Sequence, residues 1–227
     1  MRQWIEQGRE RVRTWRLDRR AAPILARIDP ARFAAIRARY GDTDPDPGSS
    51  KYLDLRPWLR IAVGRALGLE LDRTPTCDVL DLGTGCGYFP LVCRHYGHRA
   101  RALDLDDNAL YNEMVDLLQI DRRLCAIEAG VPLPALGRRF DWVTGFMVCF
   151  NNHKRDDLWG PSEWEFFLDD VRGNLLKPGG QLHLELNPEE DGSYVTPEVE
   201  RLFVSAGGWV RNGIVRVPGS ARERRTS

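Results

Sequence analysis

The sequence predicts an α/β fold, doubly wound around a mostly parallel sheet and preceded by an N-terminal helical extension. Three observations support this prediction. From residue 76 onwards, short apolar runs alternate with segments of helical periodicity, which is typical of a parallel sheet with helices on its faces. The apolar run 79–82 leads into a loop with glycine at alternate positions. Near the C-terminus, Asn212-Gly213 separates two short β-like runs and predicts a hairpin.

The first fifty residues predict two helices, at 1–20 and 31–40, and then a Pro- and Gly-rich loop. Asp29-Pro30 supplies a cap and a first-turn proline for the second helix. Residues 1–20 carry seven arginines against three acids. That face is either an ordinary solvated helix or a surface that attracts phosphate. A helix over 53–69 then leads into the first strand.

The glycine loop is the most informative segment of the chain. The first strand contains Asp81, and Gly83, Gly85 and Gly87 follow. Glycine allows sharp turns and lets a ligand lie against the backbone. The next segment, 88–96, predicts a helix whose N-terminus offers free N–H groups to an anionic part of a ligand.

The second predicted strand, 98–105, places an acid about twenty residues beyond the glycine loop. At the tip of a strand, the Asp104 carboxylate offers two acceptor oxygens to the hydroxyls of a ribose. Asp106 and Asp107 are expected to cap a helix over 108–118. An alternative assigns the ribose contact to Asp106.

The remaining elements follow from local signals. Ser162 and Glu165 form an apparent capping box for a helix that runs to Leu176. The other expected elements are a strand at 140–146, a turn at 177–180 into a strand at 181–186, a helix from 196 to 205, and the hairpin 209–217. Trp58, Trp159 and Trp164 belong either to an acceptor pocket or to the core.

Three of these features resemble the class I S-adenosylmethionine-dependent methyltransferase family. They are the acid-x-G-x-G-x-G loop that begins at Asp81, the Phe-Asp-x-Val strand at 140–143, and Leu-x-Pro-Gly-Gly at 176–180. A dinucleotide-binding loop would need its third glycine at Tyr88 instead. The resemblance implies a methyltransferase domain over 51–218, with a seven-stranded sheet that receives an antiparallel strand from the C-terminal hairpin. Residues 1–50 are an extension, and 219–227 a disordered tail.

The same resemblance implies S-adenosyl-L-methionine as the cofactor and a set of residues that bind it. In the resemblance, the Asp81 carboxylate lies near the ammonium group of the cofactor. The alternative is that it accepts hydrogen bonds that brace the loop, and both roles can hold together. Glu128 aligns with an adenine contact or is an exposed loop acid. The cofactor-binding set is Asp81, Gly83, Thr84, Gly85, Gly87, Asp104, Leu105, Glu128, Gly145 and Phe146.

The segment after the fourth strand is where a methyl acceptor would meet the cofactor. His153 is the candidate base for an acceptor hydroxyl, and Asn151 and Asn152 could orient the acceptor; a solvated polar loop is the alternative. The Asn-Pro-Pro-aromatic box of many enzymes that methylate planar amines is missing here, which disfavours N-methylation of a base or a glutamine. We expect methyl transfer to an O or N atom of a small molecule. The alternatives are a protein or RNA methyltransferase of this fold, and a scaffold that binds the cofactor without methylating.

The composition limits the partners, metals and cellular compartment that we expect. The formal net charge is zero, which makes a nucleic-acid partner unlikely for the protein as a whole. The five cysteines are odd in number and lack metal-site spacing, so no metal is expected and a reducing cytoplasm fits best. No apolar run is long enough for a membrane span. A homodimer through the N-terminal helices is a further expectation.

Overall fold

The computed structural model describes residues 2–41, 48–148 and 158–219, and of residues 2–10 only the helical backbone. The chain forms two compact units. The first contains helices and comprises Met1–Thr76, Gly85–His98 and Asp106–Asp121; the second contains the sheet and comprises Cys77–Thr84, Arg99–Leu105 and Arg122–Ser227.

The helices of the first unit are α1 (Arg2–Leu25), α2 (Pro30–Tyr40), the 3-10 turn η1 (Ser50–Leu53), α3 (Leu55–Gly68), α4 (Tyr88–His95) and α5 (Ala109–Leu117). Within this unit α3 packs against both α1 and α4, and α2 packs against α5. None of the helices in the described part of the chain combines the length and the apolar character that crossing a membrane requires.

Helix α1 is longer than its sequence predicts, because it continues through Pro23 to Leu25. Proline removes one backbone donor from a helix. Burial of Ala21 and Ile24, which are 3% and 1% exposed, favours the extra turn despite that loss. Tertiary packing therefore decides where α1 ends.

Two helix caps in this unit give opposite outcomes. The prediction at α2 is confirmed, since the Asp29 carboxylate accepts hydrogen bonds from the backbone N–H groups of Ala31 and Arg32. The prediction at α5 is wrong: Asn108 is the cap, and its side chain accepts from the N–H of Tyr111. Asn108 has the extended backbone that a cap requires, and Asp106 and Asp107 lie too far upstream to reach the first turn.

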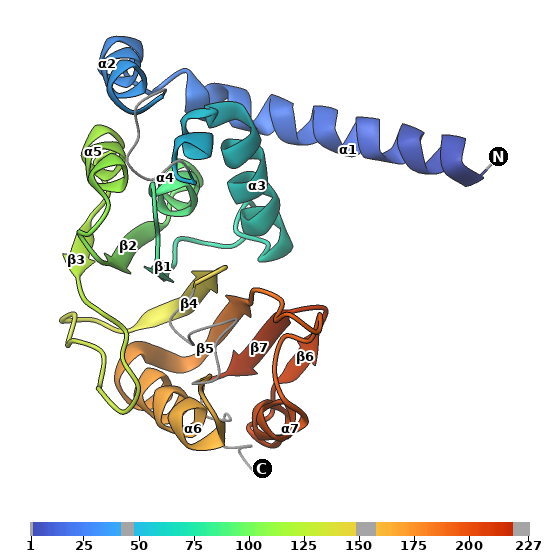
Figure 1. The fold of residues 1–227 in the computed structure, drawn as a ribbon, viewed down its shortest axis with the longest axis vertical. Helices are drawn as coiled ribbons and strands as arrows, with labels where there is room; N and C mark the ends of the chain where they lie inside the picture. The colour runs from blue at the N-terminus through green and yellow to red at the C-terminus, as the bar shows by residue number, and fades with distance from the viewer. Residues whose placement is uncertain (1, 42–47, 149–157, 220–227) are drawn as a thin grey trace. The chain divides into compact units, whose positions relative to one another are not determined.

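The second unit is built on a seven-stranded sheet of order β3-β2-β1-β4-β5-β7-β6 (Figure 1). The strands are β1 (Asp78–Leu82), β2 (Arg99–Asp104), β3 (Arg122–Leu124), β4 (Phe140–Phe146), β5 (Leu176–Glu185), β6 (Trp209–Arg211) and β7 (Ile214–Pro218). The first five strands pair in parallel, and β7 runs antiparallel to both β5 and β6. This confirms the predicted sheet and its antiparallel hairpin strand.

The segment between β4 and β5 departs from prediction at both of its ends. Helix α6 (Pro161–Asp170) begins after Gly160, whose N–H donates to the Glu163 carboxylate, so the capping box expected at Ser162 and Glu165 is wrong. Helical structure then ends in a π turn, η2 (Val171–Leu175). The expected turn at 177–180 is an irregularity within β5, where the pairing with β4 shifts.

The C-terminal elements follow the sequence closely. Helix α7 (Pro197–Ser205) is capped by the Thr196 hydroxyl, which accepts from the N–H of Val199. Asn212 and Gly213 both have positive φ angles, 49° and 75°, as a tight hairpin turn requires. The tail 220–227 lies outside the described residues.

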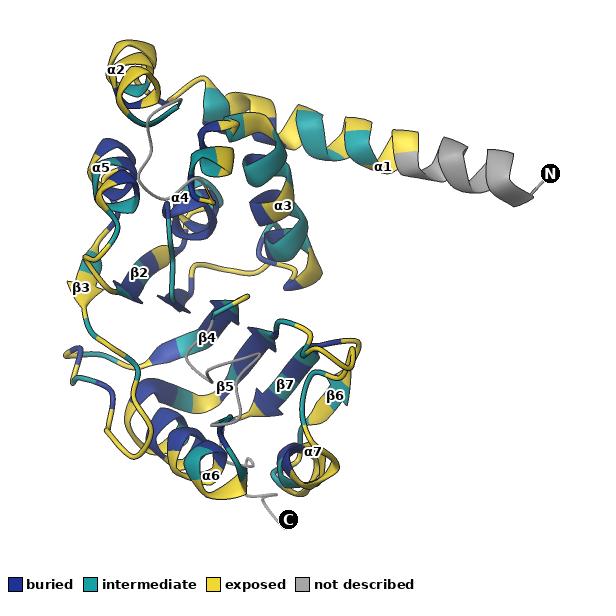
Figure 2. Cartoon of the chain, in the orientation of Figure 1, coloured by how far each residue is buried: buried dark blue, intermediate teal, exposed yellow. Residues whose placement is uncertain are grey.

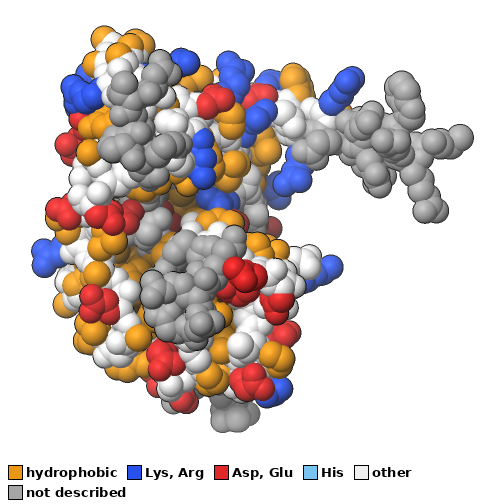
Figure 3. All heavy atoms as spheres, in the orientation of Figure 1, with side chains coloured by type: hydrophobic (Ala, Val, Ile, Leu, Met, Phe, Trp, Pro, Cys, Tyr) orange, Lys and Arg blue, Asp and Glu red, His pale blue; other side chains and the backbone are white. Residues whose placement is uncertain are grey.

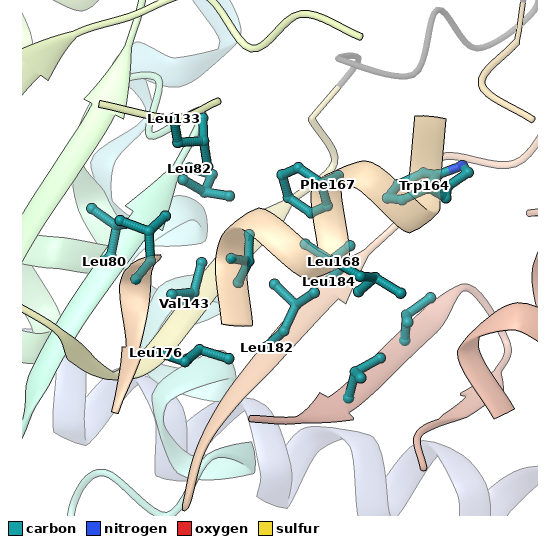
Figure 4. Packing of buried hydrophobic residues seen from close by; sticks show 14 of the residues in the cluster. Leu80, Leu82, Leu133, Val143, Trp164, Phe167, Leu168, Leu176, Leu182 and Leu184 are labelled. Carbon is teal, nitrogen blue, oxygen red and sulfur yellow. The ribbon is translucent and has the colours of Figure 1, made fainter. Parts of the chain in front are cut away.

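The core of the second unit lies between the sheet and α6, η2 and α7 (Figures 2 and 4). Apolar residues that alternate along the central strands meet aromatic side chains of α6. Trp159 and Trp164 are 7% and 1% exposed and stack edge to face, with ring centroids 5.3 Å apart. They therefore pack in the core of the second unit.

An ion cluster joins the strands at their N-terminal ends. The Asp78 carboxylate accepts two hydrogen bonds from Arg99, at 2.7 and 2.8 Å, and a third from Lys177 at 2.7 Å. Lys177 also donates to Asp141, which accepts the backbone N–H of Asp78. The cluster links residues of β1, β2, β4 and β5 at the edge of the sheet opposite to the one where ligands bind in open α/β folds.

Candidate functional site

The candidate site residues follow the carboxyl ends of β1, β2 and β4. These strands are neighbours in the sheet, with β1 in the middle. In open α/β folds ligands bind outside this edge. The glycine loop begins at this edge, directly after β1.

Asp81 lies on β1 and is 3% exposed. It pairs in register with Thr144 on β4, whose hydroxyl donates a hydrogen bond of 2.9 Å to one carboxylate oxygen. Thr144 is itself fully buried. This contact supports the second role considered for Asp81, in which its carboxylate braces the loop. Thr144 is a partner that the sequence did not indicate.

All three loop glycines have positive φ angles: 64° at Gly83, 53° at Gly85 and 79° at Gly87. At Gly83 a Cβ atom would lie 2.5 Å from the Val148 side chain, and the backbone N–H donates to the Leu103 carbonyl. At Gly87 a Cβ would lie 2.6 Å from Ile120. These two glycines are therefore required by the close packing of the loop.

Gly85 differs from Gly83 and Gly87. The nearest atom to its Cβ position is in the Tyr111 ring, at 3.9 Å, so the described residues leave room for a side chain there. The adjacent Thr84 hydroxyl is buried and has no hydrogen-bond partner among the described residues. A buried polar atom normally has a partner. Among the described residues, the Thr84 hydroxyl is therefore available to a polar group of a ligand.

An aromatic cluster borders Gly85 within the first unit. The Tyr111 ring meets Tyr52 edge to face, with centroids 5.5 Å apart, and Tyr52 packs on Trp58 at 4.4 Å. The Tyr88 hydroxyl donates to the Tyr52 carbonyl and holds that residue against α4. Tyr111 carried no sequence signal, because its place depends on how α5 packs.

Asp104 is the last residue of β2 and is partly exposed. One of its carboxylate oxygens accepts from the backbone N–H of Leu105, at 2.8 Å, and this bond orients the group at the strand end. The Asp106 side chain is exposed, and its carbonyl accepts from the Asn112 amide. Asp104 is thus the acid positioned by the strand, while Asp106 lies beyond it.

The other expected contacts occupy the same edge. Glu128 is exposed in the loop after β3, and Gly145 and Phe146 end β4. A Cβ at Gly145 would lie 3.0 Å from the Leu184 side chain, so packing alone favours glycine there. Asn151, Asn152 and His153 lie outside the described residues.

His183 is a second polar residue that sequence reasoning missed. It lies on β5 in register with Thr144, is 6% exposed, and its ring centroid lies 5.8 Å from that of Phe146. Its Nδ1 has no hydrogen-bond partner among the described residues. The alternation of a strand places it on the face that carries Asp81 and Thr144.

No protein-family model and no curated protein sequence matches this chain. Solved structures do. DesVI from Streptomyces venezuelae is 14% identical with a TM-score of 0.58, and the match covers 78% of this chain and 98% of that one. CalS10 from Micromonospora echinaspora, an amino pentose methyltransferase solved with bound S-adenosylmethionine, is 17% identical with a TM-score of 0.52, over 72% and 92% of the two chains.

The similarity to these structures extends over nearly the whole of each of them. Sequence identity this low supports a shared fold only. The strand order β3-β2-β1-β4-β5-β7-β6 agrees with the fold that the sequence motifs imply. The chain therefore has the Rossmann-like α/β fold of the class I S-adenosylmethionine-dependent methyltransferases.

Proposed function

We propose that this protein transfers the methyl group of S-adenosyl-L-methionine to a small-molecule acceptor. The glycine loop is the observation that carries the proposal. Its backbone turns through three left-handed glycines directly after β1. Among the described residues, nothing comes closer than 3.9 Å to the Cβ position of Gly85, and the Thr84 hydroxyl has no hydrogen-bond partner. The shared fold with an S-adenosylmethionine-bound methyltransferase supports it.

The residues present fit this cofactor. The open position at Gly85 permits close approach of a ligand to the backbone, and Thr84 offers a hydrogen bond to it. Asp104 would accept the ribose hydroxyls, and Leu105 and Glu128 would border the base. Gly83 and Gly87 shape the backbone of the loop that the cofactor would lie against, and Thr144 holds Asp81.

Bound S-adenosylmethionine supplies an electrophilic methyl group on a sulfonium. The task of the protein is to hold an acceptor atom in line with that methyl group and about 3 Å from it. Asn151 and Asn152 are our candidates for orienting the acceptor, and His153 for taking its proton. A small acceptor is favoured by the amino pentose substrate class of the structural neighbour CalS10.

Calorimetry with S-adenosylhomocysteine tests the cofactor without knowledge of the acceptor. We expect a dissociation constant in the micromolar range, about −8 kcal/mol. NAD serves as the control ligand, since the glycine spacing does not suit it. Tight binding of NAD with no response to S-adenosylhomocysteine would overturn the proposal.

The acceptor class needs a separate experiment. Incubation with methyl-labelled S-adenosylmethionine and a panel of amino sugars, phenols and other small hydroxy and amino compounds should transfer label to one class. A bulk RNA and a protein extract belong in the same panel. Transfer of label to either macromolecule alone would contradict a small-molecule acceptor while leaving the cofactor assignment in place.

A further inference from the structure

Residues 11–20 of α1 lie along α3, where Asp18 pairs with Arg60, but they leave apolar side chains exposed. None of these ten side chains is buried, whereas Ala21, which follows them, is. Val12 and Trp15 are 50% and 56% exposed. An isolated helical stretch is only marginally stable in water, and most helices in proteins gain stability by packing. This part of α1 therefore suits a partner that packs on it.

An open cleft of about 470 Å³ lies between this part of α1 and α3. Its lining is mostly apolar, from Val12, Leu17 and Leu67, with Arg13 and Arg16 at the side of α1. Gly64 adds to the width, because its Cβ position is open except for Leu17 at 4.0 Å. Pockets of about 300–1,000 Å³ are large enough for compact ligands or a few side chains.

The charge of the segments around the cleft is mostly positive. Residues 11–41 and 48–69 contain thirteen Lys and Arg residues against three acids, although the whole chain is neutral. Figure 3 shows Lys and Arg side chains along the described part of α1. Within the described residues, no carboxylate lies within ion-pair distance of Arg13 or Arg16. Among the described residues, the cleft thus offers an apolar centre with the positive side chains of Arg13 and Arg16 beside it.

We propose that this cleft, formed by Val12, Arg13, Arg16, Leu17, Gly64 and Leu67, binds an acidic amphipathic helix of a partner protein. Apolar residues at i, i+3, i+4 and i+7 of such a helix enter an apolar groove side by side. Glu or Asp residues flanking them pair with Arg13 and Arg16. The partner is thereby defined by an apolar stripe and negative charge.

Two other occupants suit the cleft less well. A second copy of this chain in a symmetric dimer would present the same patch, so Arg13 and Arg16 would face their own counterparts. Single-stranded nucleic acid binds through aromatic stacking platforms, whereas the lining residues of this cleft are aliphatic and arginine. An acidic amphipathic helix has both features that the cleft calls for, an apolar stripe for the lining and negative charge for Arg13 and Arg16.

The test uses the full chain and a fluorescent synthetic helix with leucine at i, i+3, i+4 and i+7 and glutamate at the flanking positions. We expect binding by anisotropy in about the micromolar range. The double variant Arg13→Glu/Arg16→Glu should weaken it by about tenfold or more. The matched control Arg27→Glu/Arg32→Glu makes the same change in charge at exposed positions outside the cleft, and should weaken binding by no more than about threefold.

Two further measurements distinguish binding in the cleft from nonspecific electrostatic attraction. A peptide with serine in place of leucine should bind at least about tenfold more weakly, because it loses the apolar contact. The variant Trp15→Ala, which removes an exposed aromatic ring that does not line the cleft, should bind like the wild type.

Several outcomes would overturn the proposal. They are no binding of the glutamate–leucine helix at low salt, equal losses in the two charge-reversal pairs, and equal binding of the serine peptide. Tighter binding of an RNA oligonucleotide or of phosphatidylserine vesicles, lost in Arg13→Glu/Arg16→Glu, would assign the surface to those ligands. A concentration-dependent dimer in sedimentation, lost in the same variant, would assign it to self-association.

Discussion

The hydroxyl of Thr144 on β4 donates a 2.9 Å hydrogen bond to the carboxylate of Asp81 on β1, and both side chains are buried. The bond joins residues 63 positions apart in the sequence. It fixes one oxygen of the acid that precedes the glycine loop. The loop thus begins from a carboxylate that the neighbouring strand holds in place.

Thr144→Val should therefore destabilise the protein. It removes the hydroxyl at nearly constant volume and leaves a buried carboxylate oxygen without this donor, which costs about 1–3 kcal/mol. Thr144→Ser keeps the hydroxyl and loses only a methyl group, at about 1 kcal/mol. Urea unfolding measures both variants, and a Val variant as stable as wild type would show that the bond contributes nothing.

Gly85→Ala separates a ligand-binding role from a purely structural one. A φ of 53° costs an alanine about 1–2 kcal/mol, while its methyl group meets nothing closer than Tyr111. If a ligand lies against this backbone, affinity for S-adenosylhomocysteine should fall by about tenfold or more.

Gly130→Ala is the matched control for Gly85. Gly130 also has a positive φ, 70°, and nothing within 4 Å of its Cβ position. We expect a similar loss of stability and unchanged affinity in calorimetry. Equal affinities of the two variants would mean that the loop at Gly85 is only a turn.

Asp104→Ala tests recognition of the ribose. Two charge-assisted hydrogen bonds, at about 1.5–3 kcal/mol each, correspond to a loss of affinity for S-adenosylhomocysteine of tens- to a thousandfold. Asp104→Asn should lose less, because one acceptor oxygen remains. Both are measured by calorimetry, with circular dichroism to check the fold.

Two neighbours serve as controls for Asp104. Asp106→Ala should leave affinity and stability nearly unchanged, since its side chain is exposed and does not cap α5. Asn108→Ala should cost about 1 kcal/mol of stability, because Asn108 is the cap. A larger loss of binding at Asp106 than at Asp104 would move the ribose contact two residues along the chain.

The ion cluster around Asp78 predicts how stability depends on pH. Hydrogen bonds from Arg99 and Lys177 hold the pKa of Asp78 well below its usual range, although burial opposes the shift. An unfolded Asp has a pKa of about 3.9. The contribution of Asp78 is therefore fully present above about pH 4 and is lost as the pH falls towards its folded pKa.

Asp78→Asn removes this contribution. The variant should be less stable than wild type at pH 7, and the difference should shrink as the pH falls below about 4 in acid unfolding followed by circular dichroism. Asp107→Asn, a change at an exposed acid, is the control and should leave the acid profile as it is. A constant difference between Asp78→Asn and wild type at every pH would argue against the cluster.

The sequence by itself determined the elements whose signals are local. The cap at Asp29, the first-turn proline of α7 and the Asn212-Gly213 turn each depend on residues within a few positions. Local sequence also determines the apolar runs of β1 and β4 and the spacing of the loop glycines. These features sufficed for the sheet and for the position of the glycine loop after β1, whereas the role of Asp104 stays a prediction.

Only the tertiary structure decided the features that depend on distant residues. Burial of Ala21 and Ile24 carries α1 past Pro23. Val148 and Ile120 explain why Gly83 and Gly87 admit no side chain. Such contacts join residues that no local pattern relates, since packing, and not propensity, selects them.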